Sequence, residues 1–143
     1  MEIREISHRS ADYEEMVDLR TRILRKPLGL EFSSDQLDKE SADYLIGAFN
    51  NGLLVGCCIL SPVSQTLIQL RQMAVEESNR KQGVGEKIIY FAESLAITHG
   101  FTTLILHARI PAVGFYERLG YRSVGPEFIE LGISHLEMQK SLS

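Results

Sequence analysis

Residues 67–85 read LIQLRQMAVEESNRKQGVG, and this stretch joins three kinds of segment. An apolar run that fits a β-strand ends at Val75, a polar turn follows, and a helical pattern begins at Val84. Gly83 and Gly85 let the backbone turn tightly and leave room for a ligand. A helix that begins here presents unpaired N–H groups and the positive end of its dipole. The stretch therefore predicts a strand, a phosphate- or pyrophosphate-binding turn and a helix.

Two well-known phosphate-binding motifs do not match this turn, although Arg80 and Lys81 add positive charge beside it. A Walker loop requires a Gly-Lys-Ser/Thr ending, and here Gly85 is followed by Glu86. A dinucleotide-binding fingerprint requires a third glycine, where this chain has Ile88. A nucleotide-binding module is therefore a less favoured interpretation. A glycine-rich turn that only caps the helix is the structural alternative.

The spacing R-x-x-G-x-G, formed by Arg80, Gly83 and Gly85, resembles the pyrophosphate loop of the GNAT superfamily of N-acetyltransferases, which bind acetyl-CoA. Downstream, residues 104–121 read LILHARIPAVGFYERLGY, which is similar to the family's strand, short helix and closing F-Y-x-x-x-G-F/Y pattern. The two motifs occur in the family's order and at its distance, and the resemblance spans about residues 2–138. Two further runs look like the H-A-Q and G-I-P-H patterns of the ElaA-like branch of this family. Arg109 stands where the first pattern has glutamine, and Ser134 stands where the second has proline. The two runs are His107-Ala108-Arg109 and Gly132-Ile133-Ser134-His135.

The resemblance implies an α/β (α+β) fold with a central mixed, largely antiparallel sheet that helices flank. Its fourth and fifth strands are expected to splay apart, and the pantetheine arm of the cosubstrate acetyl-CoA would enter that V. Backbone groups at Met73 and Val75 would then pair with the cosubstrate as with a missing strand. By the same resemblance, the residues that bind the cosubstrate are Met73, Ala74, Val75, Arg80, Lys81, Gln82, Gly83, Val84, Gly85, Glu86 and Arg109.

Hydrophobic spacing and turn residues predict the element order β-α-β-β-β-α-β-α-β-β in a single domain, residues 1–143. The expected strands are residues 2–7, a hairpin over 44–60 that turns at Asn51-Gly52, residues 67–75, residues 102–106, and two strands within 121–140 around turns near Gly125-Pro126 and Gly132. The expected helices run from Ser10 to before Pro27, over one turn around 35–38, from Val84 to Gly100, and from Pro111 to Gly120.

Composition and charge exclude several classes of protein. The 143 residues suffice for one domain, and a net charge of only −4 argues against a nucleic-acid binder. The start, MEIREISHRS, has no apolar stretch typical of a signal peptide, and the longest apolar run, residues 53–60, is too short to span a bilayer. A cytoplasmic protein with no membrane partner is therefore the default expectation. The oligomeric state is open, with a homodimer as the common case.

The two cysteines, Cys57 and Cys58, are adjacent, so on a strand they point to opposite faces and no internal disulfide is expected. A small buried residue is the favoured interpretation of each, over a reactive nucleophile. No C-x-x-C or H-E-x-x-H spacing suggests a metal site.

Acetyl transfer to an amine requires a polarised thioester, a deprotonated amine and a protonated leaving thiolate. The resemblance implies direct transfer without a covalent enzyme intermediate, and it makes Tyr116 the group that protonates the thiolate. The alternative for Tyr116 is a core residue whose hydroxyl bonds a backbone carbonyl. The strands that often carry a glutamate base in this family offer no carboxylate here, so His107 is a candidate base. His135, which Glu130 could assist, is its rival.

The expected acceptor is a primary amine of a small molecule. Arg109 could pair with a CoA phosphate or with an acid group of the acceptor. Arg22, Arg25 and Lys26 flank the expected acceptor region; such a cluster is usually a solvated face, but if it is functional the acceptor carries an acid or a phosphate. A protein N-terminus or lysine as acceptor, and a regulatory module that binds CoA without chemistry, stay open as alternatives.

Overall fold

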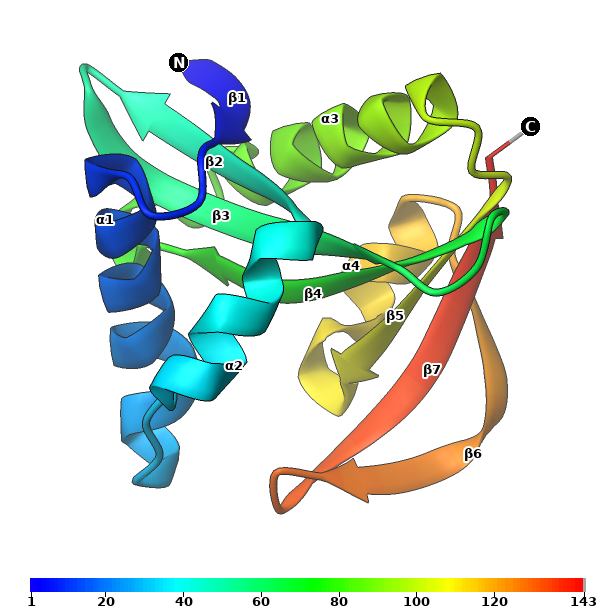
Figure 1. The fold of residues 1–143 in the computed structure, drawn as a ribbon. Coiled ribbons are helices and arrows are strands. Elements are labelled where there is room, and N and C mark those ends of the chain that lie inside the picture. Colours follow the sequence, from blue (N-terminus) through cyan, green and yellow to red (C-terminus); the bar gives the residue numbers. More distant parts are fainter. Residues whose placement is uncertain (143) are drawn as a thin grey trace.

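The computed structural model describes residues 1–142, which form one seven-stranded sheet with helices on both faces (Figure 1). The sheet order is β1-β2-β3-β4-β5-β7-β6, and every neighbouring pair is antiparallel except β4 and β5. The strands are β1 (Glu2–Ile6), β2 (Tyr44–Asn50), β3 (Leu53–Pro62), β4 (Leu67–Val75), β5 (Thr103–Arg109), β6 (Arg122–Glu130) and β7 (Ile133–Ser141). The α-helices are α1 (Ala11–Arg20), α2 (Ser34–Lys39), α3 (Val84–Thr98) and α4 (Val113–Arg118). The predicted mixed, largely antiparallel sheet is confirmed.

The sheet is apolar on both faces, so helices cover both (Figure 1). Helix α1 packs on one face, and α3 and α4 pack on the other. Side chains alternate along β3, which places Cys57 in the core under α1 and Cys58 in the core under α3. Both cysteines are buried and free, as predicted, and burial raises the pKa of the Cys57 thiol to about 12. Among residues 1–142, no helix combines the length and the apolar character needed to cross a membrane.

The predicted element order is confirmed except that a second helix, α2, precedes β2 at the turn suggested around residues 35–38, and several boundaries agree with the prediction. Strand β4 ends at Val75, α3 begins at Val84, and Asn51-Gly52 joins β2 to β3. The Ser10 hydroxyl caps α1 by accepting a hydrogen bond from the Tyr13 N–H at 3.1 Å. These boundaries were predictable because local capping and turn chemistry determines them.

Two segments differ from the prediction. The first long helix is regular only to Arg20; the chain continues as a π-turn over Thr21–Arg25 and a 3₁₀ turn over Lys26–Leu28. The Thr21 hydroxyl donates to the Val17 carbonyl at 2.7 Å, a back-bond that bends helices. The predicted turn at Gly125-Pro126 is wrong, because these residues form an irregularity inside β6. Strand β6 pairs with β7 on both sides of them, so the extra residues are accommodated as a bulge.

Strands β4 and β5 pair only along their first halves, from Leu67 to Leu70 on β4. Beyond Leu70 they diverge, as Figure 1 shows, so the predicted splay is confirmed. On its other edge β4 stays paired with β3, where the register shifts and Gln72 adopts a φ of 56°. Such a bulge increases the local twist of the strand. Within the described chain, residues 71–75 therefore have no strand partner on the β5 side.

A buried ion pair fixes the end of α1. The Arg20 guanidinium donates to both carboxylate oxygens of Glu40, at 2.8 and 2.7 Å, and the Tyr13 hydroxyl donates to Glu40 at 2.6 Å. Burial alone would raise the pKa of Glu40, but the hydrogen bonds from Arg20 and Tyr13 outweigh burial and lower it. The pair holds in place the segment Thr21–Arg25, which follows Arg20 directly.

Candidate active site

A cavity of about 1260 Å³ opens where β4 and β5 diverge. It is bordered by the N-terminus of α3, helix α4, the segment Thr21–Arg25 and the β6–β7 hairpin. All residues predicted from the sequence to bind the cosubstrate or to act in catalysis line this cavity, with the exception of Gln82. The Gln82 side chain instead donates to the Ser78 carbonyl at 3.3 Å, within the turn itself.

The loop before α3 has the backbone of an anion site. Lys81 and Gly83 have positive φ angles of 67° and 78°, a geometry that glycine adopts without strain. The first helical bond runs from the Lys87 N–H to the Gly83 carbonyl at 3.1 Å, and no side chain caps the helix. The earlier N–H groups of the first turn therefore have no intrahelical acceptor and lie at the positive end of the dipole.

Gly85 lies at a close approach between elements. A Cβ atom at this position would lie 3.3 Å from the Phe115 ring and 3.4 Å from the Met73 methyl group. Helix α3 thus begins directly beside α4 and the unpaired part of β4. This contact brings the loop, the strand edge and α4 around one cavity.

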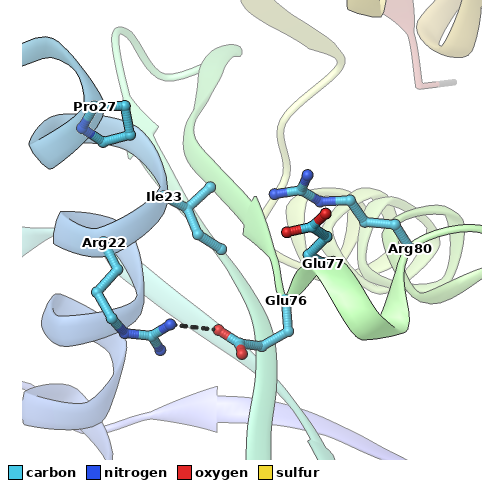
Figure 2. Close-up of a pocket in the computed structure, with 6 residues that line it drawn as sticks. All are labelled: Arg22, Ile23, Pro27, Glu76, Glu77 and Arg80. Atoms are coloured by element: carbon cyan, nitrogen blue, oxygen red, sulfur yellow. Dashed lines mark hydrogen bonds and ion pairs between the residues drawn. The ribbon is translucent and has the colours of Figure 1, made fainter.

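Arg80 lies at the junction of the loop and β4. Its Nε donates to the Val75 carbonyl at 3.1 Å, and its side chain borders both the main cavity and a neighbouring hollow of about 480 Å³ (Figure 2). Figure 2 shows the Arg22–Glu76 ion pair of 2.8 Å across this hollow. Arg22 also pairs with Asp18 at 2.9 Å, so its guanidinium group forms ion pairs with two carboxylates. Of the basic cluster noted in the sequence, only Arg25 lines the main cavity.

Tyr116 lines the cavity from α4 and is 7% exposed. Its ring packs edge-on against Phe115 and Tyr121, at centroid distances of 5.1 and 5.9 Å. Burial raises the pKa of its phenol, so the hydroxyl keeps its proton at neutral pH. Within residues 1–142 this hydroxyl makes no hydrogen bond, whereas the Tyr121 hydroxyl donates to Glu93 at 2.7 Å. Within residues 1–142 the carbonyl bond of the core alternative is absent, while the ring itself is part of the buried core.

His135 is buried on β7 with one nitrogen committed to the backbone. Its Nδ1 lies 2.8 Å from the Ile133 carbonyl, and because a carbonyl only accepts, Nδ1 carries the proton. In the neutral ring Nε2 is then the atom with a free lone pair. Nε2 lies 4.0 Å from Glu130. The arrangement fits a general base whose tautomer is fixed by its neighbour.

His107 has a different environment on β5. Its Nδ1 lies 3.0 Å from Glu130, and its Nε2 lies 3.5 Å from Glu137, its partner across the β5–β7 ladder. Both ring nitrogens can donate at the same time only as an imidazolium. Phe128 packs against both histidine rings, at centroid distances of 5.0 Å from His107 and 5.9 Å from His135. The carboxylates at this site thus come from the β6–β7 hairpin: Glu130, which the sequence suggested as a partner of His135, and Glu137, which it did not suggest.

The comparisons with known proteins agree with this geometry. The sequence family described as "Acetyltransferase (GNAT) domain" matches residues 23–142. The uncharacterized N-acetyltransferase YitI of Bacillus subtilis is 32% identical over 136 residues, covering 90% of this chain and 91% of the relative.

Two solved structures share the fold. Escherichia coli ElaA has a TM-score of 0.84 at 18% identity and covers 98% of this chain and 99% of its own. An aminoglycoside 6'-N-acetyltransferase complexed with coenzyme A has a TM-score of 0.82 at 21% identity, with coverages of 100% and 98%. At these identities the likeness concerns the fold, so membership of the ElaA-like branch stays a prediction. The family match over most of the chain and the relative at 32% identity show that this protein belongs to the GNAT family of acetyl-CoA-dependent acetyltransferases.

Proposed function

We propose that the cavity transfers the acetyl group of acetyl-CoA directly to a primary amine of a small molecule. The single observation that carries this proposal is the meeting of three features in one cavity. They are the uncapped N-terminus of α3, the unpaired edge of β4 and the Tyr116 hydroxyl, which makes no hydrogen bond within residues 1–142.

The N-terminal turn of α3 suits the pyrophosphate of CoA. Backbone N–H groups at Val84 and Gly85, together with the dipole, favour an anion there, and the side chains of Arg80 and Lys81 add positive charge. The free edge of β4 over residues 73–75 suits the amide groups of the pantetheine arm, which can pair with it as an added strand. Acetyl-CoA then supplies an activated thioester carbonyl near Tyr116.

Tyr116 and His135 divide the proton transfers. The His135 Nε2 accepts a proton from the amine, whose nitrogen forms the new C–N bond to the acetyl carbon. The Tyr116 hydroxyl donates a proton to the sulfur as the C–S bond breaks. A phenol with a raised pKa keeps its proton until the thiolate develops. Glu130 lies next to both histidines and stabilises the positive charge that His135 acquires.

The experiment is a thiol-release assay of acetyl-CoA against a panel of amino acids, amino sugars, simple amines and short peptides, with mass spectrometry of each product. We expect one class of small amine to gain a single acetyl group. Turnover confined to peptide N-termini or peptide lysines would replace the small-molecule acceptor with a protein. Tight CoA binding with no turnover on any acceptor would favour a regulatory module.

A further inference from the structure

The acceptor end of the cavity carries a cluster of positive charge that the proposed CoA contacts do not use. Arg25, Arg71 and Arg109 all line the cavity, and they come from three separate elements: the segment after α1, strand β4 and strand β5. We propose that these three arginines bind an anionic group, a carboxylate or a phosphate, on the same small molecule that presents the amine. This inference rests on the proposed acetyl transfer and specifies its acceptor.

Each of the three guanidinium groups has only neutral neighbours at contact distance. Arg109 donates to the Leu24 carbonyl at 3.4 Å, and Arg71 donates to the Ser61 hydroxyl at 3.3 Å. Arg25 stacks over the Phe32 ring at 4.3 Å. Within residues 1–142 none of the three forms an ion pair. These contacts orient the side chains without an ion pair, and only the longer-range charges of Glu40 and Asp43 offset part of their positive charge.

Four of the other arginines form ion pairs, whereas Arg80, Arg118 and Arg122 form none within residues 1–142. Arg4, Arg9, Arg20 and Arg22 each pair with a carboxylate at 3.2 Å or less. Within residues 1–142 no carboxylate forms an ion pair with the three arginines of the cluster, and Glu40 and Asp43 act on them only at longer range.

The positive charges of the cluster also repel one another. Burial lowers the pKa of Arg25, the positive charges of Arg20, Arg71 and Arg109 lower it further, and the charge of Glu40 opposes part of this shift. Like charges held together in a partly buried site are unfavourable until an anion joins them, and a planar guanidinium binds a carboxylate or phosphate in bidentate fashion. An acidic acceptor would supply that anion.

The carboxylates that do line the cavity are occupied elsewhere. Glu86 accepts a hydrogen bond from the Tyr90 hydroxyl at 2.9 Å on α3, and Glu130 lies beside His107. Neither compensates the three arginines. Arg109, which the resemblance assigned to the cosubstrate, has its one side-chain hydrogen bond to the segment after α1 and none to the loop before α3. Its position therefore favours the acceptor over a CoA phosphate.

The position of Arg109 also fixes the geometry of the acceptor. Arg109 and His135 are direct partners across the β5–β7 ladder, and such partners project from the same face of the sheet within a few ångströms of each other. An anion held at Arg109 therefore lies close to the amine that His135 deprotonates. A short spacing between acid and amine, as in an amino acid or a phosphorylated amino alcohol, fits this arrangement. Polycationic amines such as aminoglycosides fit it poorly.

Matched acceptors test the inference. Each amino acid is compared with its carboxamide, and phosphoethanolamine with ethanolamine, by kcat/KM for thiol release. We expect the anionic member of at least one pair to be favoured about tenfold to hundredfold, the range of one or two charge-assisted hydrogen bonds. The carboxylate and phosphate arms show which anion the site prefers. The inference is wrong if kcat/KM is equal or higher for every neutral twin, or for an aminoglycoside, than for the anionic acceptors. That result would leave the proposed acetyl transfer itself unaffected.

Single substitutions show which arginines produce the preference for an anionic acceptor. Arg71→Gln and Arg109→Gln should each lower kcat/KM for the anionic acceptor about tenfold or more and leave its neutral twin nearly unchanged, with CoA affinity unaltered. Arg122→Gln is the matched control, because Arg122 is exposed on β6, lies outside the cavity and makes no ion pair within residues 1–142. A loss that is equal for both twins, or equal in the control, contradicts a binding role for the cluster.

Binding measurements separate this inference from the proposed function. Each N-acetylated amino acid and its amide are titrated by calorimetry into the protein, with and without CoA. If CoA does not bind, the proposed function fails, and preference for the acetylated acid over its amide still decides the inference. If CoA binds and no amine reacts, the same preference, lost in Arg109→Gln, supports the anion site. Equal affinity for acid and amide refutes it.

Discussion

Replacing Tyr116 with phenylalanine removes one oxygen atom from the cavity and leaves the ring packing intact. If the phenol protonates the leaving thiolate, kcat should fall about 100-fold or more, the lower end of the range for lost general acid catalysis. That loss corresponds to about 2.7 kcal/mol of activation free energy. The affinity for CoA should hardly change, because the ring still contacts Phe115 and Tyr121 at its edges.

The same substitution should not destabilise the fold. The Tyr116 hydroxyl makes no hydrogen bond within residues 1–142, so its loss should change the free energy of unfolding by less than about 0.5 kcal/mol. Tyr121→Phe is the matched control. It removes the 2.7 Å hydrogen bond to Glu93, which is 12% exposed and also accepts from Lys140. Tyr121→Phe should therefore cost about 1.5–3 kcal/mol and leave kcat nearly unchanged.

The assay is steady-state thiol release at saturating acetyl-CoA and acceptor, alongside urea unfolding of both variants. A pre-steady-state burst is checked first, because product release can hide an effect on chemistry. If chemistry limits the rate and the folded Tyr116→Phe variant retains wild-type kcat at every pH, Tyr116 is a packing residue and the proposed mechanism is wrong. A large loss of stability in Tyr116→Phe would likewise contradict an unbonded hydroxyl.

Three further predictions concern separate parts of the molecule. Gly83→Val should weaken CoA binding in calorimetry by about 1–3 kcal/mol, because a side chain at this positive φ strains the loop; unchanged affinity would place the pyrophosphate elsewhere. His135→Gln should remove the acid-side limb of the pH profile of kcat/KM, and His107→Gln should retain that limb; the reverse result would make His107 the base. Glu40→Gln should cost about 3 kcal/mol in urea unfolding near neutral pH, because it leaves Arg20 buried without its ion pair. The pKa of Glu40 is lowered in the fold, so its stabilisation is present above about pH 4.3 and is lost as the pH falls through the lowered value; a difference that stays constant with pH contradicts this assignment.

Local chemistry explains which parts of the fold the sequence could predict. Ser10, Asn51-Gly52 and Gly83 each determine their structure through backbone groups a few residues away, and their elements begin or end where expected. Gly125-Pro126 looked like a turn by the same rules. It became a bulge because β6 pairs with β7 on both sides, a tertiary constraint that no local pattern contains.

The candidate site was predictable only where it is continuous in sequence. The loop over residues 80–86 and Tyr116 belong to two compact motifs, and Tyr116 and the whole loop except Gln82 line the cavity. Glu137 and Arg71 were missed because their importance comes from pairing across strands. Glu137 lies opposite His107 on β7, and Arg71 lies beside the bulge of β4. Strand register, which the sequence alone does not determine, brings both to the site.

A crystal structure of the protein with CoA bound would show whether the CoA sulfur lies at Tyr116. We expect the pyrophosphate at the N-terminal turn of α3, the pantetheine arm along residues 73–75 of β4, and the sulfur within hydrogen-bonding distance of the Tyr116 hydroxyl. A sulfur atom remote from Tyr116, or a pyrophosphate bound away from the turn at Gly83, would contradict the proposed site.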